Sequence, residues 1–420
     1  MLGDAGALVA FSSAANAGIT IPAGDWTVDI GGVVNAYYTN TRESGGFVGG
    51  NGSVLGGSNA TNLKNSSNIT TGLLPNYLAV SGKTRQNDLD IAFTISLNPG
   101  ASTTHSAIQG SNQENRQAFL TIGDASWGSV KLGKDLGIYA SDAILNDMTL
   151  LGVGSGAGIL AGNTTTLGRI GTGFMYADWK SQIAYTTPNW NGLQATVGMT
   201  QAWNTYGVGV NTPSQLADGG TGSATGAFNS AYSTGRSGNA SPAWEGKVSY
   251  SFTADQVTGK VWASGITQQV KGLNDYTNNA AIAGADNSAE AWDLGATVSF
   301  AGASLTGYYG EGSGMGTTVQ LRDGFDHTGK QRDSKDWYLQ ATYVLPTIGT
   351  KLGASYGESQ LDGTAHDAFT RYENNMWTVG AYHPLTKSVN LVAEYSNVET
   401  KITNTKGESK TVSLGAILFF

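Results

Sequence analysis

Apolar and polar residues alternate with a period of two in several separate stretches of this 420-residue chain. In the first stretch Trp26, Val28 and Ile30 are apolar, while Thr27 and Asp29 between them are polar. This is the period of a β-strand whose two faces meet different surroundings. Each stretch is about ten residues long, the length that a tilted strand needs to cross a bilayer. The same alternation recurs at residues 89–97, 193–199, 292–300, 337–345 and 412–420.

The connections between the stretches alternate between short and long, and this alternation predicts the architecture. Transmembrane β-barrels have short turns at one rim and long loops at the other. Counting strands between the long segments gives about sixteen, which predicts an all-β antiparallel transmembrane barrel with a water-filled lumen. No linker separates a second folded domain. Short turns are expected at 86–88, 124–128, 189–192, 253–256, 301–303, 347–350 and 386–388, and long segments at 41–71, 99–116, 135–172, 204–243, 272–288, 312–335, 362–373 and 402–409.

Composition excludes several other classes of protein. There are 60 glycines and 8 prolines, and no long uncharged apolar run marks a membrane-spanning helix. The chain has no cysteine, which excludes a disulfide framework and thiolate metal sites and is compatible with export. A net charge of −8 without a basic patch argues against nucleic acid as a partner.

The N-terminus has features of a secretory signal. The apolar stretch Ala5 to Phe11 leads to Ala15 and Ala17, an A-x-A cleavage pattern. Residues 1–17 are therefore interpreted as a truncated signal peptide, and residues 18–420 as the barrel. The segment begins with Asp4 instead of a basic residue, so an ordinary flexible N-terminus is the alternative.

The C-terminal strand ends on an aromatic residue. Val412, Leu414, Ala416, Leu418 and Phe420 share one face. A terminal phenylalanine of this kind resembles the assembly signal of Gram-negative outer-membrane barrels. From about residue 26 onward the chain resembles the general trimeric porin family. Two local matches support this: residues 127–134 resemble the strand before that family's third loop, and residues 28–32 and 37–38 resemble its first strand.

This resemblance implies a water-filled outer-membrane channel for ions and small hydrophilic solutes. It also implies periplasmic short turns, extracellular long loops, an inward-folded third loop and a homotrimer. Membrane lipid, lipopolysaccharide and, through Phe420, the barrel-assembly machinery would then be its partners. Two features depart from the family: the acidic, glycine-rich tip of the third loop is missing, and loops one and four are unusually long.

The third long segment is the candidate constriction of the pore. Its apolar residues between 140 and 151 have helical spacing, and Asp142 is a candidate cap for that helix. Carboxylates on the loop facing basic groups on the wall would create a transverse field that favours small polar solutes. The constriction candidates are Asp135, Asp142 and Asp147, and the wall candidates, on the polar face of their strands, are Lys83, Arg85, Lys131, Lys180 and Lys247. Each could instead be merely solvated in a wet lumen.

Other interpretations remain open at the level of sequence. Long external loops would also suit an adhesin or structural barrel. His327 near Asp326, or His366 near Asp367, could form an acid/base pair of a hydrolase at the outer rim. No cofactor or metal site is indicated, although loop carboxylates could hold a divalent cation loosely. Outward aromatic girdles are expected from Trp26, Tyr38, Trp244, Trp292, Trp337 and Tyr343, and scattered inward aromatic residues from Tyr338 and Trp377.

Overall fold

A computed structural model describes residues 18–45, 64–101, 113–155, 164–203, 241–273, 285–326, 329–367 and 369–420. The proposed signal segment, residues 1–17, lies outside these ranges. The described residues form one antiparallel sheet of nineteen strands. Three short ones are β1 (Ile19–Ala23), β3 (Asn65–Thr70) and β6 (Gln113–Glu114). No helix in the described ranges is long and apolar enough to cross a membrane.

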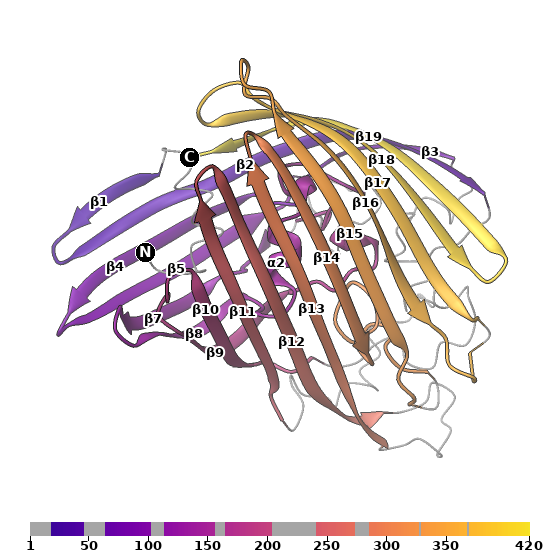
Figure 1. Ribbon diagram of the computed structural model, residues 1–420, viewed down its shortest axis with the longest axis horizontal. Coiled ribbons are helices and arrows are strands. Elements are labelled where there is room, and N and C mark those ends of the chain that lie inside the picture. The colour runs from indigo at the N-terminus through magenta and orange to yellow at the C-terminus, as the bar shows by residue number, and fades with distance from the viewer. Residues whose placement is uncertain are drawn as a thin grey trace.

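The other sixteen strands pair in sequence order and close into a barrel (Figure 1). This confirms the predicted architecture. The strands are β2 (Trp26–Gly45), β4 (Tyr77–Gln86), β5 (Leu89–Pro99), β7 (Ala118–Asp124), β8 (Gly128–Leu136), β9 (Trp179–Thr186), β10 (Leu193–Thr200), β11 (Ala243–Ala254), β12 (Val257–Leu273), β13 (Ala285–Phe300), β14 (Ala303–Ser313), β15 (Asp333–Val344), β16 (Lys351–Asp362), β17 (Arg371–Pro384), β18 (Val389–Ile402) and β19 (Thr405–Phe419).

The first and last strands close the ring. Residues 407–419 of β19 pair with residues 33–45 of β2. Beyond them the backbone N–H of Gly32 donates to the carbonyl of Phe420 at 2.8 Å, and the N–H of Phe420 donates to the carbonyl of Gly32 at 3.1 Å. From that point β1 takes over the same edge of β2. The edge of β2 is therefore paired along almost its whole length.

The two faces of the strands have opposite chemistry. The apolar residues that the period-two pattern identified lie outward, as in Leu294 and Leu339, which are 49% and 51% exposed. Their neighbours along the strands point inward and are mostly small or polar, such as Thr306 and Ser355. The outside of the barrel is thus apolar where lipid would contact it, and the inside is polar.

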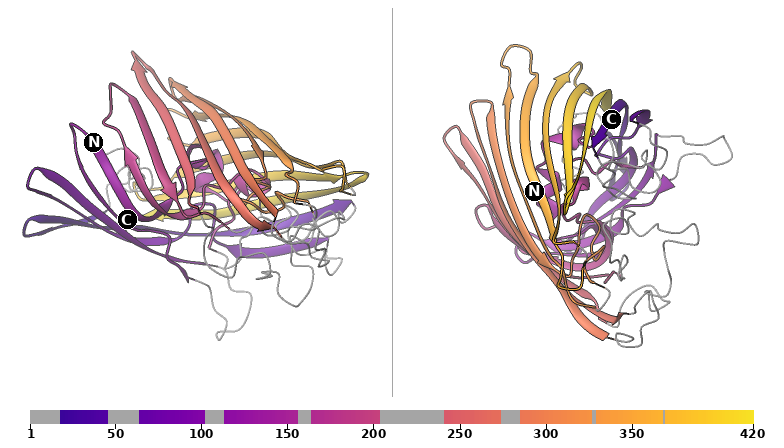
Figure 2. Two further views of the ribbon diagram at one scale, coloured as in Figure 1. Left: turned by 90° about the horizontal axis from the view of Figure 1, so that it is seen from below. Right: turned by 90° about the vertical axis from the view of Figure 1, so that its right-hand side faces the viewer.

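Short turns join strands at one end of the barrel, and the strand ends that border the longer connections lie at the other (Figure 2). Asn87 and Asp88 both have positive φ, 50° and 62°, as a two-residue hairpin of type I′ requires. One predicted long connection is wrong. Only residues 403 and 404 join β18 to β19, so 402–409 is a tight hairpin. Both faces of these strands are polar here, so the sequence shows no alternation of apolar and polar residues by which the strands could be recognised.

The closing seam is tightly packed at Gly415. A Cβ atom at this position would lie 2.3 Å from the carbonyl oxygen of Ala36 and 2.5 Å from the ring of Tyr37. The missing side chain therefore lets the Tyr37 ring approach β19 closely.

We expect Gly415→Val to destabilise the barrel by about 1–3 kcal/mol, because the new side chain overpacks the seam. The midpoint of urea-induced unfolding of the refolded protein measures this change. Gly307→Ala is the control, since the nearest atom to its added Cβ is 3.8 Å away. Equal midpoints for the two variants would contradict the role given to this seam.

Candidate pore and its inner segment

The connection between β8 and β9 lies inside the barrel. Its described parts, residues 137–155 and 164–178, are called the inner segment below. It contains α2 (Ser141–Leu145) and two short 3₁₀ helices, η3 (Met148–Leu151) and η4 (Ile170–Thr172). Nearly all of its residues are buried, and Figures 1 and 2 show α2 enclosed by the strands.

Two glutamates of the wall hold the backbone of the inner segment. Glu245 on β11 accepts the N–H groups of residues 138 and 139 at 2.8 and 2.9 Å. Glu394 on β18 accepts those of residues 153 and 154, both at 2.8 Å. Hydrogen bonds to a carboxylate are about twice as strong as neutral ones and compensate for its burial. Since β11 and β18 lie far apart around the ring, these anchors stretch the segment across the lumen.

Inward tyrosines add further anchors. Tyr338 donates to the carbonyl of Ala143 at 2.8 Å, and Tyr37 donates to the carbonyl of Leu151 at 2.6 Å. Tyr382 donates to Glu394 at 2.6 Å. These rings are buried under the inner segment, so they support the loop and do not offer solutes an open aromatic surface.

Opposed charges meet where α2 approaches the wall. The carboxylate of Asp142 lies 2.5 Å from the Nζ atom of Lys260 and 3.1 Å from that of Lys247. Lys247 also lies 3.1 Å from the hydroxyl of Ser141. Asp142 does not cap α2, because the N-cap is Ala140 in the left-handed conformation with no side-chain cap bond. The carboxylate is directed to the wall lysines instead.

The cap predicted for Asp142 is found at Asp147, the N-cap of η3. It accepts the N–H and the hydroxyl of Thr149 at 3.0 and 2.7 Å. Burial raises the pKa of Asp147, and the nearby charge of Arg169 opposes that rise. Burial likewise lowers the pKa of Arg169, whose guanidinium donates to the carbonyl of Met376 at 3.0 Å and to Ser355. The backbone N–H of Arg169, the N-cap of η4, donates to the hydroxyl of Thr149 in η3 at 3.3 Å and joins the two helices.

The connection between β14 and β15 packs beside the inner segment. Tyr176 donates its backbone N–H to the carbonyl of Thr318 at 2.8 Å. The side-chain oxygen of Gln320 lies 3.1 Å from Nζ of Lys180. Within the same connection, burial raises the pKa of Asp323 to about 6. Two connections therefore pack against each other inside the barrel.

Comparison with known proteins decides the identity of this barrel. The model of the Gram-negative porin family matches residues 5–403. The chain belongs to the Gram-negative porin family. A search of curated proteins returned no match.

Solved structures of outer-membrane proteins share the fold at low sequence identity. The outer membrane channel DcaP of Acinetobacter baumannii has a TM-score of 0.66 and 16% identity, over 96% of this chain and 100% of that one. The anion-selective porin from Comamonas acidovorans has a TM-score of 0.56 and 15% identity, over 94% and 100%. The trimer form of in-vitro folded OmpT of Vibrio cholerae has a TM-score of 0.54 and 11% identity, over 94% and 99%.

Family membership assigns this porin to the outer membrane as an integral β-barrel. It also makes the barrel a channel for small solutes, and not an enzyme.

The five predicted wall cations of this porin do not gather at one level. Lys180 is fully buried and lies 2.6 Å from the equally buried Glu245. Lys83 and Arg85 lie at the short-turn end, beside a hollow of about 310 Å³. There Arg85 bridges Asp90 at 2.8 Å and Asp124 at 2.9 Å. Of the five, Lys131 pairs with Asp135 and Lys247 pairs with Asp142.

Asp135 is not a residue of the loop, contrary to the prediction. It lies in β8, which continues to Leu136. Its carboxylate pairs with Lys131 on the same face of the strand and accepts a hydrogen bond from Gln117 at 3.0 Å. Lys131 and Asp135 therefore neutralise each other on the wall.

Trp377 was expected among inward aromatic residues, and that was wrong. It lies outward on β17 and is 39% exposed, because Met376 and Thr378 take the buried face. Both faces of β17 carry apolar residues here, so the alternation of apolar and polar residues does not show which face points inward. Trp244, Trp292 and Trp337 lie outward as expected.

Sequence reasoning missed Glu245, Glu394, Arg169 and Lys260. For three of them a signal was available: Glu245 shares the inward face of β11 with Lys247, and the parities of β12 and β18 place Lys260 and Glu394 inward. Nothing in the local sequence marks Arg169, since its partners lie on β16 and β17.

The described histidines form no catalytic arrangement. Nδ1 of His366 lies 3.0 Å from Asp326, and that of His383 lies 2.8 Å from the hydroxyl of Thr350. His105 and His327 lie outside the described residues, so the pair predicted at His327 is not described. Among the described residues, no group of three or more histidine or acidic side chains could hold a metal ion.

We expect Lys180→Met to destabilise the barrel by about 3–5 kcal/mol, because it leaves the charge of Glu245 buried without its partner. The double variant Lys180→Met with Glu245→Gln should recover most of this loss, since the amide oxygen still accepts from the inner segment. Urea-unfolding midpoints of both variants test this. Equal losses would show that the charge of Glu245 is not what Lys180 balances.

The raised pKa of Asp323 predicts a pH dependence of stability. The folded state holds this proton up to a pH of about 6, whereas the unfolded state releases it near 3.8. Stability should therefore fall as the pH rises between these values. Asp323→Asn should remove this slope and stabilise the barrel at pH 7.5 by up to about 3 kcal/mol. Urea unfolding at pH 4, 5, 6 and 7.5 measures it.

Asp255→Asn, at an exposed turn, is the matched control and should keep the slope of the wild type. If Asp323→Asn also keeps it, the proton is held by another group.

Proposed function

We propose that this porin is a weakly selective diffusion channel whose ion preference is set where Asp142 faces Lys247 and Lys260. The observation that carries this proposal is the pair of distances, 2.5 and 3.1 Å, between the loop carboxylate and two lysines of the wall. Charges of opposite sign across a narrow passage order water and favour polar solutes over apolar ones.

The balance of charge at this point gives the direction of the preference. Two ammonium groups face one carboxylate, which leaves one net positive charge among these three side chains. The charges of Lys180 and Glu245, and those of Lys131 and Asp135, cancel in pairs. Lys260 is the group of the cluster that remains partly accessible, at 23% exposure. We infer a weak preference for anions.

The reversal potential of the refolded porin in a planar bilayer, under a salt gradient, tests this. Asp142→Asn should strengthen the anion preference, and Lys260→Met should shift it toward cations. One unit of charge at a partly screened site changes the permeability ratio roughly twofold to fivefold. Glu358→Gln, which lies outward on β16, is the control and should leave the ratio unchanged.

If neither Asp142→Asn nor Lys260→Met changes the reversal potential, ions are selected elsewhere in the pore. A folded, inserted barrel without any conductance would favour the adhesin or structural alternative.

The remaining expectations from the family are part of the same proposal. Residues 1–17 would be removed as a signal peptide, the long segments would face the cell exterior, and three chains would assemble. Phe420 would be recognised by the barrel-assembly machinery. Its ring packs against Gly32, with Cζ 2.8 Å from where a Cβ would lie, so the same residue also completes the seam. Contact with lipopolysaccharide would follow from the location in the outer membrane.

A further inference from the structure

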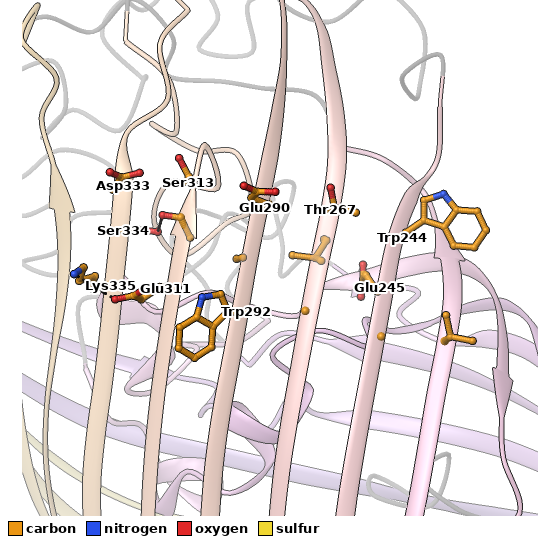
Figure 3. Close-up of a pocket in the computed structure, with 16 residues that line it drawn as sticks. Trp244, Glu245, Thr267, Glu290, Trp292, Glu311, Ser313, Asp333, Ser334 and Lys335 are labelled. Carbon is orange, nitrogen blue, oxygen red and sulfur yellow. Dashed lines mark hydrogen bonds and ion pairs between the residues drawn. The ribbon is translucent and has the colours of Figure 1, made fainter.

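The connection between β14 and β15 turns into the barrel. It begins after Ser313 and ends before Asp333, which are cross-strand neighbours at the ends of the two strands (Figure 3). Of residues 314–326, all but Val319 are buried. Connecting segments usually run over the surface of a protein, so this burial places the connection inside the lumen. Residues 314–326 and 329–332 are called the plug below.

The plug packs against the inner segment. Its apolar side chains belong to one buried cluster with Tyr139 and Met175 of that segment. They are Met315, Leu321 and Phe325. The side-chain amide of Gln320 donates to the carbonyls of Tyr176 and Ala177 at 3.2 and 3.4 Å. The plug therefore narrows the lumen beside the inner segment.

The backbone of the plug is strained. Thr318, Leu321 and Asp323 have φ values of 60°, 69° and 57°. Residues other than glycine rarely adopt this left-handed region, least of all β-branched ones such as threonine. One carboxylate oxygen of Asp323 is also buried without a hydrogen-bond partner. Strained residues persist only where surrounding contacts hold them, and they cluster in switch segments, so the position of the plug depends on contacts from outside it.

Arg332 joins the plug to the connection between β16 and β17. Its guanidinium donates to both carboxylate oxygens of Asp367, at 2.6 and 2.9 Å, and both side chains are fully buried. The same guanidinium donates to the carbonyls of Asp323 and Phe325 at 2.9 and 2.8 Å. One side chain thus holds the fold of the plug and ties it to a neighbouring connection.

A second tie between the two connections lies nearer the solvent. Asp326 of the plug accepts a hydrogen bond from the hydroxyl of Thr364 at 2.5 Å, and Nδ1 of His366 lies 3.0 Å from the same carboxylate. The side chain of His366 is 46% exposed. Residues 364–367 are called the latch below. Because these ties are polar, water can replace them once the latch and the plug separate.

We propose that the plug is a gate held in the lumen by the latch. When the latch separates, the plug leaves the lumen and the strain at Thr318, Leu321 and Asp323 is relieved. The channel then has a narrow state with the plug inside and a wide state with the plug outside. Each hydrogen bond to a charged group in the latch shifts the equilibrium between these states by about tenfold. This inference rests on the channel function of the family and does not depend on the ion preference proposed above.

Single-channel recording in a planar bilayer tests the gate with a covalent latch that can be switched. The chain has no cysteine, so Asp326→Cys combined with Thr364→Cys places one reactive pair between the plug and the latch. A short bis-methanethiosulfonate reagent joins the two thiols, and dithiothreitol releases them. The unlinked variant should occupy the wide state about tenfold more than the wild type, because the Asp326 carboxylate is lost. Linkage should return the channel to the narrow state.

Exclusion of neutral polymers separates a wider lumen from a changed charge. Polyethylene glycols that enter the pore lower its conductance, so the wide state should admit larger polymers than the narrow state does. Asp326→Cys also removes a negative charge, which alters the ion current but not the size of polymer that enters.

Thr364→Val is a milder variant, and it keeps the test decisive if the cysteine pair does not fold. It removes one hydrogen bond to Asp326 and should raise the population of the wide state about fivefold. Thr405→Val, at an exposed position of the hairpin between β18 and β19, is its matched control. Lys401→Cys with Lys406→Cys, cross-strand neighbours in that hairpin, is the control for linkage. Neither control should change the two states.

Two results would overturn the proposal. If the linked and unlinked cysteine pairs, with linkage confirmed by mass, show the same conductance states and admit the same polymers, the plug does not move. If the wide state persists after linkage, opening does not require the latch to separate, and another part of the barrel is the gate.

Discussion

Backbone pairing between β2 and β19 is the constraint on which the rest of this structure depends. Lipid offers no partner to a backbone N–H or carbonyl, so a sheet can cross the membrane only if it has no open edge. The pairing of residues 33–45 with 407–419, continued by Gly32 with Phe420, removes that edge. Gly415 and Phe420 both contribute to this contact. Gly415 leaves room because it has no side chain, and the ring of Phe420 packs against Gly32.

Closure of the ring has a consequence for the interior. Most apolar residues of the strands face outward, so apolar contacts with the wall alone cannot hold the inner segment. Besides the apolar cluster that Ile144, Met148 and Phe174 form with inward residues of the wall, polar side chains reach its backbone, above all those of Glu245 and Glu394. A carboxylate that accepts two N–H groups brings its charge into the interior, and the partners Lys180 and Tyr382 offset the cost of burying it. The anchors of the loop and the buried ion pairs are therefore parts of one arrangement.

The sequence predicted the strands of the barrel wall better than the segment inside the barrel. Period-two parity depends only on neighbouring residues, which is why it found the strands and placed Lys180 and Lys247 inward. It failed where both faces of a strand are alike, as at 402–409 and Trp377. The inner segment was out of reach for another reason: its contacts join residues far apart, such as Val153 and Glu394, which are 241 positions apart. Parity shows that Glu394 points inward, but nothing local shows what it meets there.

Most charges inside the barrel are structural, and this distinction narrows the search for the functional ones. Lys180 with Glu245, and Asp147 near Arg169, are buried, so neutralising one member disturbs the fold before it disturbs an ion in the pore. Asp142 with Lys247 and Lys260 differs in two respects. Its charges do not cancel, and Lys260 keeps contact with solvent. A field that acts on a passing solute needs both an imbalance of charge and access to the solute, which is why we propose this cluster as the site that sets the ion preference.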